Sequence, residues 1–490
     1  MRCAAIPMLL ALFCATGASG QAWLGFANSS YGGMHTAFHN PAMLANTHLA
    51  MQFGIPSADV GITNNYLRYR SGVRGSDIRQ LFRFGGNTYD GVRKKDITEV
   101  LADYFGGNRF EQVYDGNSKN LNISGEFRGP SVMLAIPMGG IGIYYRARAA
   151  MQVRDVDQEM ARLIFNGFKY NGVSDAASII DSKFSIGLNA YHELGASLGM
   201  RAGRIGHHYF SAGATVKYLA GIYALNVVNR GLSLQIIDKD NLISLSSEVG
   251  YNYLDGRYLD DSDGLLPKPV GHGMGVDFGG VWEYRPLDDG ESNAPGYGHH
   301  KARIGVSVVD LGFINYSSAK YVRSLDVAKR NQSIYWGRID TVDIKSPAGL
   351  DSILTGVFSL PASKTKFQTG LPTVVNIQGE YQLYKGLYIG ANLTTSLRAK
   401  ARSGLRAFSN IVLIPRYESN LFEFALPTGL GLAGKAFQMG MFFRFSGFFV
   451  GSDNITSFFG SSLGNSGFNM YVGGFVPIRK RTPLATPKVW

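Results

Sequence analysis

A serine nucleophile is the first chemistry that the residues suggest, because Gly195-Ala196-Ser197-Leu198-Gly199 matches the pattern of a nucleophile elbow. That motif works on a sharp turn between a strand and a helix, where the serine side chain is exposed. Here it lies at the end of a segment whose polar and apolar residues alternate, which is typical of a strand. We therefore expect Ser197 not to be catalytic. The sequence contains no other nucleophile with a base at a suitable spacing, so we do not expect an enzyme.

Metal binding is the second chemistry to consider. The pairs His207-His208 and His299-His300 could bind a metal through neutral imidazoles, but no third ligand lies at a recognisable spacing. The acidic stretch Asp260-Asp261-Ser262-Asp263-Gly264 has Leu259 where a calcium loop needs its first acidic ligand. We expect solvated loops here, with no metal site and no cofactor. A phosphate-binding loop and a basic run with interleaved aromatics are also missing from the sequence, so no nucleic-acid partner is expected.

Charged side chains on the polar faces of alternating segments are the remaining candidates for chemistry. On a barrel strand these faces point into the lumen, where bases could attract anionic ligands such as carboxylates. They could equally pair with acids and fill the interior of the barrel. Both interpretations stay open. The candidate lumen-facing residues are Arg146, Arg148, Lys217, Asp277, Glu283, Glu380 and Arg444, with Glu126 as a further acidic partner.

These candidates need strands to position them, and alternating segments recur along the chain. From Ile141 to Val153, apolar residues occupy the odd positions and polar residues most of the even ones. This segment is longer than an ordinary soluble strand of about five or six residues. It suits a tilted strand that crosses a bilayer, which needs about 9–11 residues. Similar segments lie at 209–218, 273–284, 373–383, 387–397 and 435–449, and shorter or less regular ones at 49–55, 121–127, 132–138, 184–194, 241–251, 302–309 and 468–476.

The connections between these segments alternate between short and long. Met138-Gly139-Gly140 and Tyr384-Lys385-Gly386 read as tight turns, whereas 70–120, 154–183 and 313–372 are long. Outer-membrane barrels combine brief turns on one side with extended loops on the other. The predicted fold class is therefore all-β, a transmembrane antiparallel β-barrel of about 14 strands, within a range of 12 to 16. A soluble β-sandwich is the alternative, but it does not need strands of this length.

The composition excludes two other classes. Of the 490 residues, 62 are Gly and only 17% are charged, with a formal net charge of +12. Soluble domains carry roughly 25% charged residues, so a polar-surfaced cytosolic enzyme is disfavoured. Apart from its first residues, the chain has no apolar run of about 18 residues, which argues against a helical membrane protein.

The first twenty residues have the features of a secretory signal. The apolar stretch Ala4–Ala15 follows a basic start, and Ala18-Ser19-Gly20 supplies small residues before a cut at Gln21. Both cysteines, Cys3 and Cys14, lie within this segment. We expect residues 1–20 to be removed, which leaves a mature chain without a disulfide or a thiolate metal ligand.

Residues 21–48 precede the first predicted strand and contain Asn40-Pro41-Ala42. Asn40 can cap a helix, and Pro41 fits the first turn of one. The segment resembles the N-terminal hatch of FadL-like outer-membrane transporters, in which an Asn-Pro-Ala motif leads into the first strand. The resemblance implies that residues 21–48 fold into or under the lumen. It makes Asn40, Pro41 and Ala42 candidate hatch or ligand-binding residues.

Three later stretches carry a second resemblance. Gly275–Gly279, Ile304–Phe313 and Val450–Asn454 resemble an uncharacterised outer-membrane barrel family of Bacteroidota, near the FadL-like and PorP/SprF-like groups. This resemblance implies the outer membrane of a Gram-negative bacterium. The predicted organisation is a signal peptide at 1–20, a hatch or plug at 21–48, a barrel at 49–478 and a basic tail at 479–490. The tail reads as disordered or as a periplasmic extension with a partner.

Two functions remain open. The first is passive uptake of small hydrophobic or amphipathic molecules. The second is a structural adaptor barrel in a cell-envelope complex, such as type IX secretion, to which the PorP/SprF-like resemblance points. A lumen occluded by residues 21–48 that opens to an apolar pocket would favour uptake. A lumen filled with salt bridges, together with an exposed apolar patch of several hundred Å² on the loops or the periplasmic rim, would favour the adaptor. The expected partners are outer-membrane lipid and either a small hydrophobic ligand or envelope proteins, and the sequence names no substrate.

Overall fold

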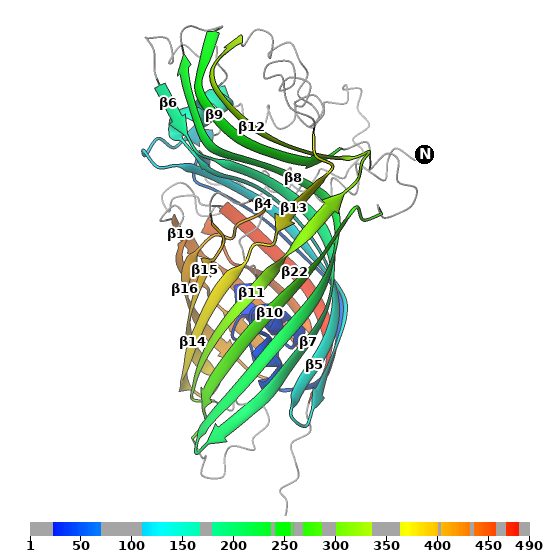
Figure 1. Ribbon diagram of the computed structural model, residues 1–490. Coiled ribbons are helices and arrows are strands. Elements are labelled where there is room, and N and C mark those ends of the chain that lie inside the picture. Colours follow the sequence, from blue (N-terminus) through cyan, green and yellow to red (C-terminus); the bar gives the residue numbers. More distant parts are fainter. Residues whose placement is uncertain are drawn as a thin grey trace, which may run out of the picture.

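Fourteen antiparallel strands close into a barrel, as the alternation predicts (Figure 1). Closure is complete because the first wall strand pairs on one side with the second and on the other with the last. The computed structural model describes residues 23–69, 110–166, 179–236, 241–255, 258, 268–286, 300–335, 363–399, 403–431, 436–456 and 467–479. The predicted signal at 1–20 and the tail from residue 480 onward lie outside these residues. None of the described helices is long and apolar enough to cross a bilayer.

The wall consists of twelve continuous strands and two interrupted ones. In the interrupted pair, the breaks at Leu426-Pro427 and at Gly440 lie side by side, joined by a hydrogen bond from Gly440 N to Pro427 O. In order round the barrel the wall strands are β1 (Leu49–Asn64), β4 (Lys119–Ile136), β5 (Gly139–Val156), β7 (Ser185–Ile205), β8 (His208–Ile236), β10 (Gly271–Tyr284), β11 (Ala302–Ser317), β14 (Val374–Tyr384), β15 (Leu387–Ser396), β16 (Asn410–Glu418), β17 (Phe422–Ala425) with β18 (Thr428–Gly431), β19 (Ala436–Met439) with β20 (Met441–Phe445), β21 (Phe448–Ser452) and β22 (Gly467–Arg479).

A second layer of strands rises above one side of the barrel (Figure 1). The long strand β8 continues past the barrel rim and pairs there with β6 (Ile179–Ser182) and β9 (Asn241–Leu254). Strand β9 pairs in turn with β12 (Val322–Tyr335), and β13 (Lys366–Gly370) pairs with the upper end of β11. The short strands β2 (Leu67–Tyr69) and β3 (Phe110–Gln112) form a separate pair, and helix α5 (Gln158–Asn166) follows β5.

Three predictions differ from the structure in how strands are divided or where they belong. The segments 121–127 and 132–138 form one strand, β4, because pairing with β5 continues through a register shift between Arg128 and Ser131. Segment 435–449 is broken by a turn at Ser446-Gly447, where Ser446 has a φ of 54°. Segment 241–251 is a strand, but it belongs to the upper layer and not to the barrel wall.

The outer face of the wall carries an apolar band bounded by amphipathic side chains. On β10, Met274 and Phe278 point outward and are more than half exposed (62% and 52%). His272 and Trp282 flank them, and ten residues separate these two positions. At about 3.3 Å per residue and a tilt of about 40°, that spacing corresponds to roughly 25 Å, the height of the lipid-facing band of membrane barrels. The outer face of β10 is therefore built to contact lipid chains.

Trp282 should lie at the headgroup level on the side of the short turns. We expect its emission in vesicles to be quenched roughly twofold more by lipids brominated near the headgroup than by lipids brominated near the chain end. The difference between the spectra of the wild-type protein and of Trp282→Phe isolates this residue from the other tryptophans. Equal quenching at both depths would contradict the placement.

Residues 23–48, here called the plug, lie inside the lower half of the barrel (Figure 1). The plug contains the short helical turns η2 (Leu24–Phe26), α2 (Met34–Ala37) and η3 (Pro41–Asn46). Nearly all of its residues are buried. Most of its apolar side chains form a core with the wall, in which Trp23, Phe26, Phe442, Phe449 and Tyr471 pack together, and a smaller cluster joins Ala42 and Met43 to Val281. The plug thus replaces water as the filling of the lower lumen.

Candidate functional site

A row of glycines on four adjacent strands forms the seat of the plug. Each glycine is the direct cross-strand neighbour of the next, and all face the lumen where η3 lies. A Cβ atom at Gly213 would overlap the backbone of Pro41 and Ala42. The plug backbone can therefore approach this part of the wall only because side chains are absent there. The row consists of Gly140 on β5, Gly199 on β7, Gly213 on β8 and Gly279 on β10.

The Asn40-Pro41-Ala42 motif lies directly on this row. The Asn40 side chain accepts a hydrogen bond from Ala42 N at 3.0 Å and so caps η3, with Pro41 at its first position. The Asn40 amide also donates to the backbone oxygen of Gly280 at 3.2 Å. The motif thus both starts a turn of 3-10 helix and attaches that turn to β10. Asn40 and Ala42 are fully buried.

Polar side chains of the wall hold the plug backbone beyond the glycine row. Ser307 Oγ donates to His39 O at 2.6 Å, and Asn376 Nδ2 donates to the same oxygen at 3.2 Å. Gln378 Nε2 donates to Ala27 O at 2.7 Å. These bonds satisfy carbonyl groups that no regular helix or sheet would satisfy within the plug.

The start of the described chain is fixed by a carboxylate from the far end of the sequence. Both oxygens of Asp453 accept backbone hydrogen bonds, from Trp23 N at 2.7 Å and from Leu24 N at 2.8 Å. The Trp23 ring stacks on Tyr471, with centroids 5.1 Å apart and planes inclined by 7°. The guanidinium of Arg128 also lies over the Trp23 ring, 3.6 Å from the ring centroid. Neither Asp453 nor Arg128 was among the candidate residues, since nothing in the sequence links them to position 23.

The two plug histidines are buried as neutral rings. Burial lowers the pKa of His39 to about 3, and the positive charge of Arg128 lowers it further. Burial also lowers the pKa of His35 well below its ordinary value, again with a contribution from Arg128. Arg128 Nη1 lies 3.2 Å from His35 Nδ1, so that nitrogen accepts the hydrogen bond.

These histidines make stability fall on acidification. An unfolded histidine takes up a proton near pH 6.5, whereas the buried one stays neutral down to a much lower pH, so folding loses about 1.4 kcal/mol per pH unit for each such group. We expect the urea-unfolding free energy to fall less steeply between pH 6.5 and 4.5 in His39→Gln than in the wild type. The outward-facing His208→Gln is the control. Parallel pH profiles for the wild type and His39→Gln would contradict the neutral assignment.

Four candidate charges meet in an ion network above the plug. Lys217 Nζ lies 2.7 Å from Asp277 Oδ1 and 2.6 Å from Asp310 Oδ1. Arg148 pairs with Asp310 at 2.9 Å. The remaining candidate, Arg146, pairs with Glu193 at 2.8 Å, and Glu126 reaches the network through Arg146 at 3.5 Å.

Asp310 and Glu193 are members of this network that sequence reasoning missed, and Asp310 was missed for a structural reason. It follows the apolar pair Val308-Val309 and breaks the alternation of β11. The structure places it at a bulge, where the register of β10 and β11 shifts between Val276 and Phe278 and Asp310 has a φ of 58°. The bulge turns its side chain into the lumen, toward Arg148 and Lys217.

The other three candidate charges belong to a second network beside the lower part of the plug. Glu380 pairs with Arg416 at 2.7 Å, and Glu283 pairs with Arg303 at 2.8 Å. Arg444 pairs with Glu423 at 3.0 Å. The candidate charges therefore all face the lumen but form two clusters, not one site. The arginine and glutamate partners on β16 and β17 were missed because alternation is weak over 410–427.

His300 also belongs to the second network, which corrects its expected place in an exposed loop. Its side chain is buried, with Nε2 2.6 Å from Glu380 Oε1 and Nδ1 3.0 Å from Arg303 Nη2. Ser197 is buried in β7, where its hydroxyl is 2.8 Å from that of Thr215. His299 and the acidic stretch 260–264 lie outside the described residues. Among the described residues, no group of three or more metal-binding side chains is found.

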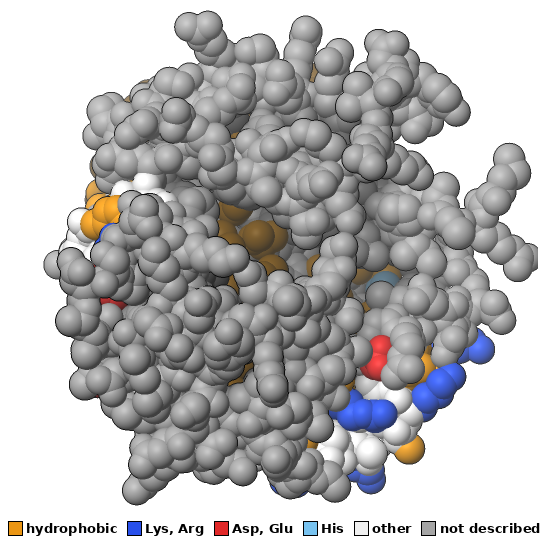
Figure 2. All heavy atoms as spheres, turned by 90° about the horizontal axis from the view of Figure 1, so that it is seen from above, with side chains coloured by type: hydrophobic (Ala, Val, Ile, Leu, Met, Phe, Trp, Pro, Cys, Tyr) orange, Lys and Arg blue, Asp and Glu red, His pale blue; other side chains and the backbone are white. Residues whose placement is uncertain are grey.

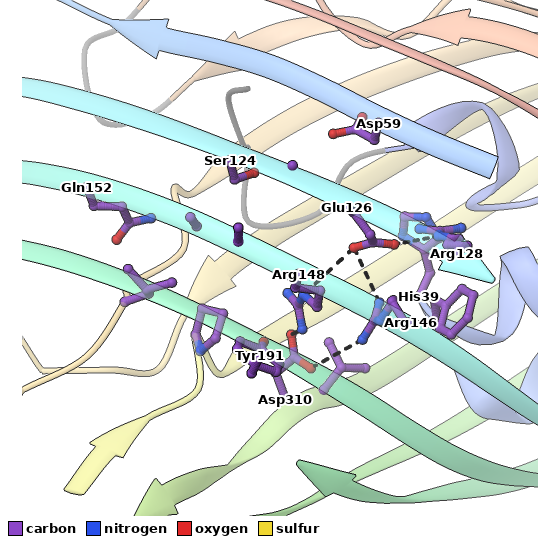
Figure 3. Close-up of a pocket in the computed structure, with 17 residues that line it drawn as sticks. His39, Asp59, Ser124, Glu126, Arg128, Arg146, Arg148, Gln152, Tyr191 and Asp310 are labelled. Carbon is purple, nitrogen blue, oxygen red and sulfur yellow. Dashed lines mark hydrogen bonds and ion pairs between the residues drawn. The ribbon is translucent and has the colours of Figure 1, made fainter. Parts of the chain in front are cut away.

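A small cavity of about 60 Å³ lies between the first network and the plug, and residues of both line it (Figure 3). Phe38 and His39 of the plug form part of its wall, together with Arg148, Gln152 and Asp59 from the barrel. A cavity of this size holds a few water molecules or a group of a few heavy atoms.

An apolar layer lies beside and above the cavity. Tyr191 lines the cavity and also packs with Leu219, Ile314 and Tyr316 in a buried cluster. Tyr316 stacks on Phe367 of β13, with ring centroids 5.1 Å apart. Seen from the loop side, hydrophobic side chains lie at the bottom of a central hollow (Figure 2). The apolar layer and the small cavity therefore adjoin each other at Tyr191.

Comparisons with known proteins give one family and two structural likenesses. No curated protein matches the chain in sequence. A TodX monoaromatic hydrocarbon channel, solved as a deltaS2 mutant, is 9% identical and aligns over 92% of this chain and 95% of its own, with a TM-score of 0.29. A Pseudomonas aeruginosa FadL homologue is 9% identical over 91% of this chain and 94% of its own, with a TM-score of 0.22. The model of a family of unknown function (DUF5723) matches residues 41–453, from the plug motif to the Asp453 carboxylate that holds the plug, and the chain belongs to that family.

Proposed function

We propose that the protein is an outer-membrane barrel of a Gram-negative bacterium that takes up small hydrophobic or amphipathic molecules passively, with the plug as its gate. The order of environments along the lumen carries the proposal. An apolar layer built around Tyr191 and Tyr316 comes first, then the small cavity, and then the plug. A molecule with an apolar body gains free energy on leaving water for such a layer. The apolar band on the outside of β10 supports a location in the membrane.

The plug is suited to gating because only non-covalent contacts hold it in the described structure. Its hydrogen bonds to Ser307 and Gln378 are each worth about 1 kcal/mol net, and those to the Asp453 carboxylate about 1.5–3 kcal/mol each, so the part held by Ser307 and Gln378 can be released at lower cost than the end held by Asp453. Release of η3 from the glycine row would connect the cavity with the short-turn side. Passage therefore depends on whether the plug can move.

A disulfide between plug and wall tests this dependence. Asn46 Nδ2 and Ser211 Oγ are hydrogen-bonded at 3.1 Å, so Asn46→Cys with Ser211→Cys places two thiols across the plug boundary. We expect uptake of dodecanol into proteoliposomes to stop on oxidation and to return on reduction. The single variant Asn46→Cys is the control, and a barrel without residues 21–48 should show uptake and ion conductance that no longer respond to oxidant. Uptake by the oxidised double variant at the wild-type rate would refute gating by the plug.

A structural adaptor is the second candidate, because ion pairs fill the lower lumen around Arg303 and Arg416. In that case the barrel would be closed at all times and would anchor proteins of an envelope complex, such as type IX secretion in Bacteroidota. Affinity purification from the native outer membrane separates the two candidates. Stoichiometric protein partners with no dodecanol uptake favour the adaptor, whereas uptake by the isolated barrel favours transport.

A further inference from the structure

Asp59 on β1 is a buried carboxyl group that faces the cavity; no described base lies within 4.0 Å of it, and Asn469 forms a side-chain hydrogen bond with it. Its side chain is 3% exposed, and its Oδ2 atom makes no hydrogen bond with the described residues. Figure 3 shows Asp59 at the edge of the cavity, with no interaction drawn to the other residues that line it. Its cross-strand neighbour on β4 is Glu126, another carboxylate, so the neighbouring strand supplies no compensating charge at that position.

The charges around the cavity do not balance. The bases of the first network and its surroundings number four, and the carboxylates number five. Of these five carboxylates, only Asp59 has no described base within 4.0 Å, so an ionised Asp59 would carry the surplus negative charge. Asp453, the other carboxylate nearby, already accepts hydrogen bonds from Trp23 and Leu24. The bases are Arg128, Arg146, Arg148 and Lys217, and the paired carboxylates are Glu126, Glu193, Asp277 and Asp310.

A buried charge without a partner is unfavourable by several kcal/mol, and a positive group in the cavity would compensate it. An anionic group would meet the opposite situation, because Arg146, Arg148 and Lys217 are already paired. Ser124 also lines the cavity and offers a hydroxyl oxygen on the strand next to Asp59. The volume of about 60 Å³ admits only a small group.

We infer that the cavity binds a small monovalent cation with Asp59 as its counter-ion. If the proposed uptake function holds, on which this second step rests, the cation is the primary ammonium headgroup of an amphipathic substrate. The apolar chain of the substrate would then lie in the apolar layer. Tyr191 belongs to that layer and also lines the cavity, so the two sites adjoin.

The test measures binding to the full mature barrel in a non-ionic detergent by isothermal titration calorimetry. The probes are methylammonium chloride, sodium chloride and sodium acetate, followed by dodecylammonium and dodecanoate. Methylammonium should bind, and Asp59→Asn should weaken its binding about tenfold or more, because the buried counter-charge is lost. The exposed Glu248→Gln is the matched control and should bind like the wild type. Stronger binding of sodium than of methylammonium would identify a free metal ion as the occupant, and the reverse would identify an ammonium group.

Two outcomes overturn the inference. One is equal binding of acetate and methylammonium to the wild-type barrel, a comparison that holds even if Asp59→Asn does not fold. The other is no binding of any cation, with an infrared band of a protonated carboxyl group that disappears in Asp59→Asn, since a proton then neutralises Asp59. Dodecanol uptake does not depend on cation binding or on the protonation of Asp59, because dodecanol is uncharged. Dodecanol entry without methylammonium binding would remove the cation site and leave the uptake function intact.

Discussion

Replacing Lys217 by Met is expected to lower the free energy of unfolding by about 3–5 kcal/mol, because two buried carboxylates lose their shared counter-charge. Lys217 is 1% exposed, and its ammonium lies within 2.7 Å of both Asp277 and Asp310. The two residues are also joined directly, since the backbone N–H of Asp310 donates to Asp277 Oδ1 at 2.7 Å. Urea unfolding of the barrel in lipid vesicles, followed by tryptophan emission, measures the effect.

The matched control for this variant is Lys320→Met, which removes a charge from an exposed position at the loop end. The double variant Lys217→Met with Asp277→Asn should recover part of the loss, because it removes one of the two carboxylates left uncompensated. A loss below about 1 kcal/mol in Lys217→Met would mean that water reaches this network and screens it.

Replacing Gly213 by Val is expected to prevent the plug from seating. The new side chain would occupy the space of the Pro41-Ala42 backbone, which cannot shift without giving up the glycine row on three other strands. The expected result is a folded barrel with an unseated plug. Hydrogen exchange over residues 23–48 should then rise toward that of an unstructured segment, and ion conductance in planar bilayers should approach that of the barrel without residues 21–48.

Gly203→Val is the control for this prediction, because a Cβ atom at Gly203 meets no atom within 4 Å. Both variants carry the same substitution in the same hairpin of β7 and β8, so a general effect of valine on folding would appear in both. Protection of residues 23–48 that is unchanged in Gly213→Val would show that η3 does not need this seat.

Much of the barrel could be predicted because the side chains of a strand alternate between its two faces. That rule alone placed Lys217 and Asp277 on the lumen side of their strands, where the structure has them. It fails where the backbone departs from a regular strand. Asp310 lies at a bulge, and Ser446 lies in a turn with a left-handed backbone conformation. The alternation of side chains along a regular strand therefore could not predict the position of either residue.

The plug seat could not be predicted, for a different reason. Each glycine of the row is one of many in the chain, and only the register of four strands brings these four side by side. The Asp453 carboxylate meets Trp23 across 430 positions of sequence. His300 was misplaced for the same reason, since its partners Arg303 and Glu380 become neighbours only when β11 pairs with β14. Relations of this kind depend on the closed barrel and not on a local pattern.

The distance in sequence between the plug and its seat has a consequence for biogenesis. Residues 23–48 are synthesised before every strand that holds them, and contacts to the plug continue into the last strand, β22, where Tyr471 stacks on Trp23. Ordering the plug before the wall is complete would cost chain entropy with few contacts to offset it. The segment made first must therefore be placed last. An N-terminal segment that has docked thus reports a finished barrel, and one still accessible to proteases marks an assembly intermediate.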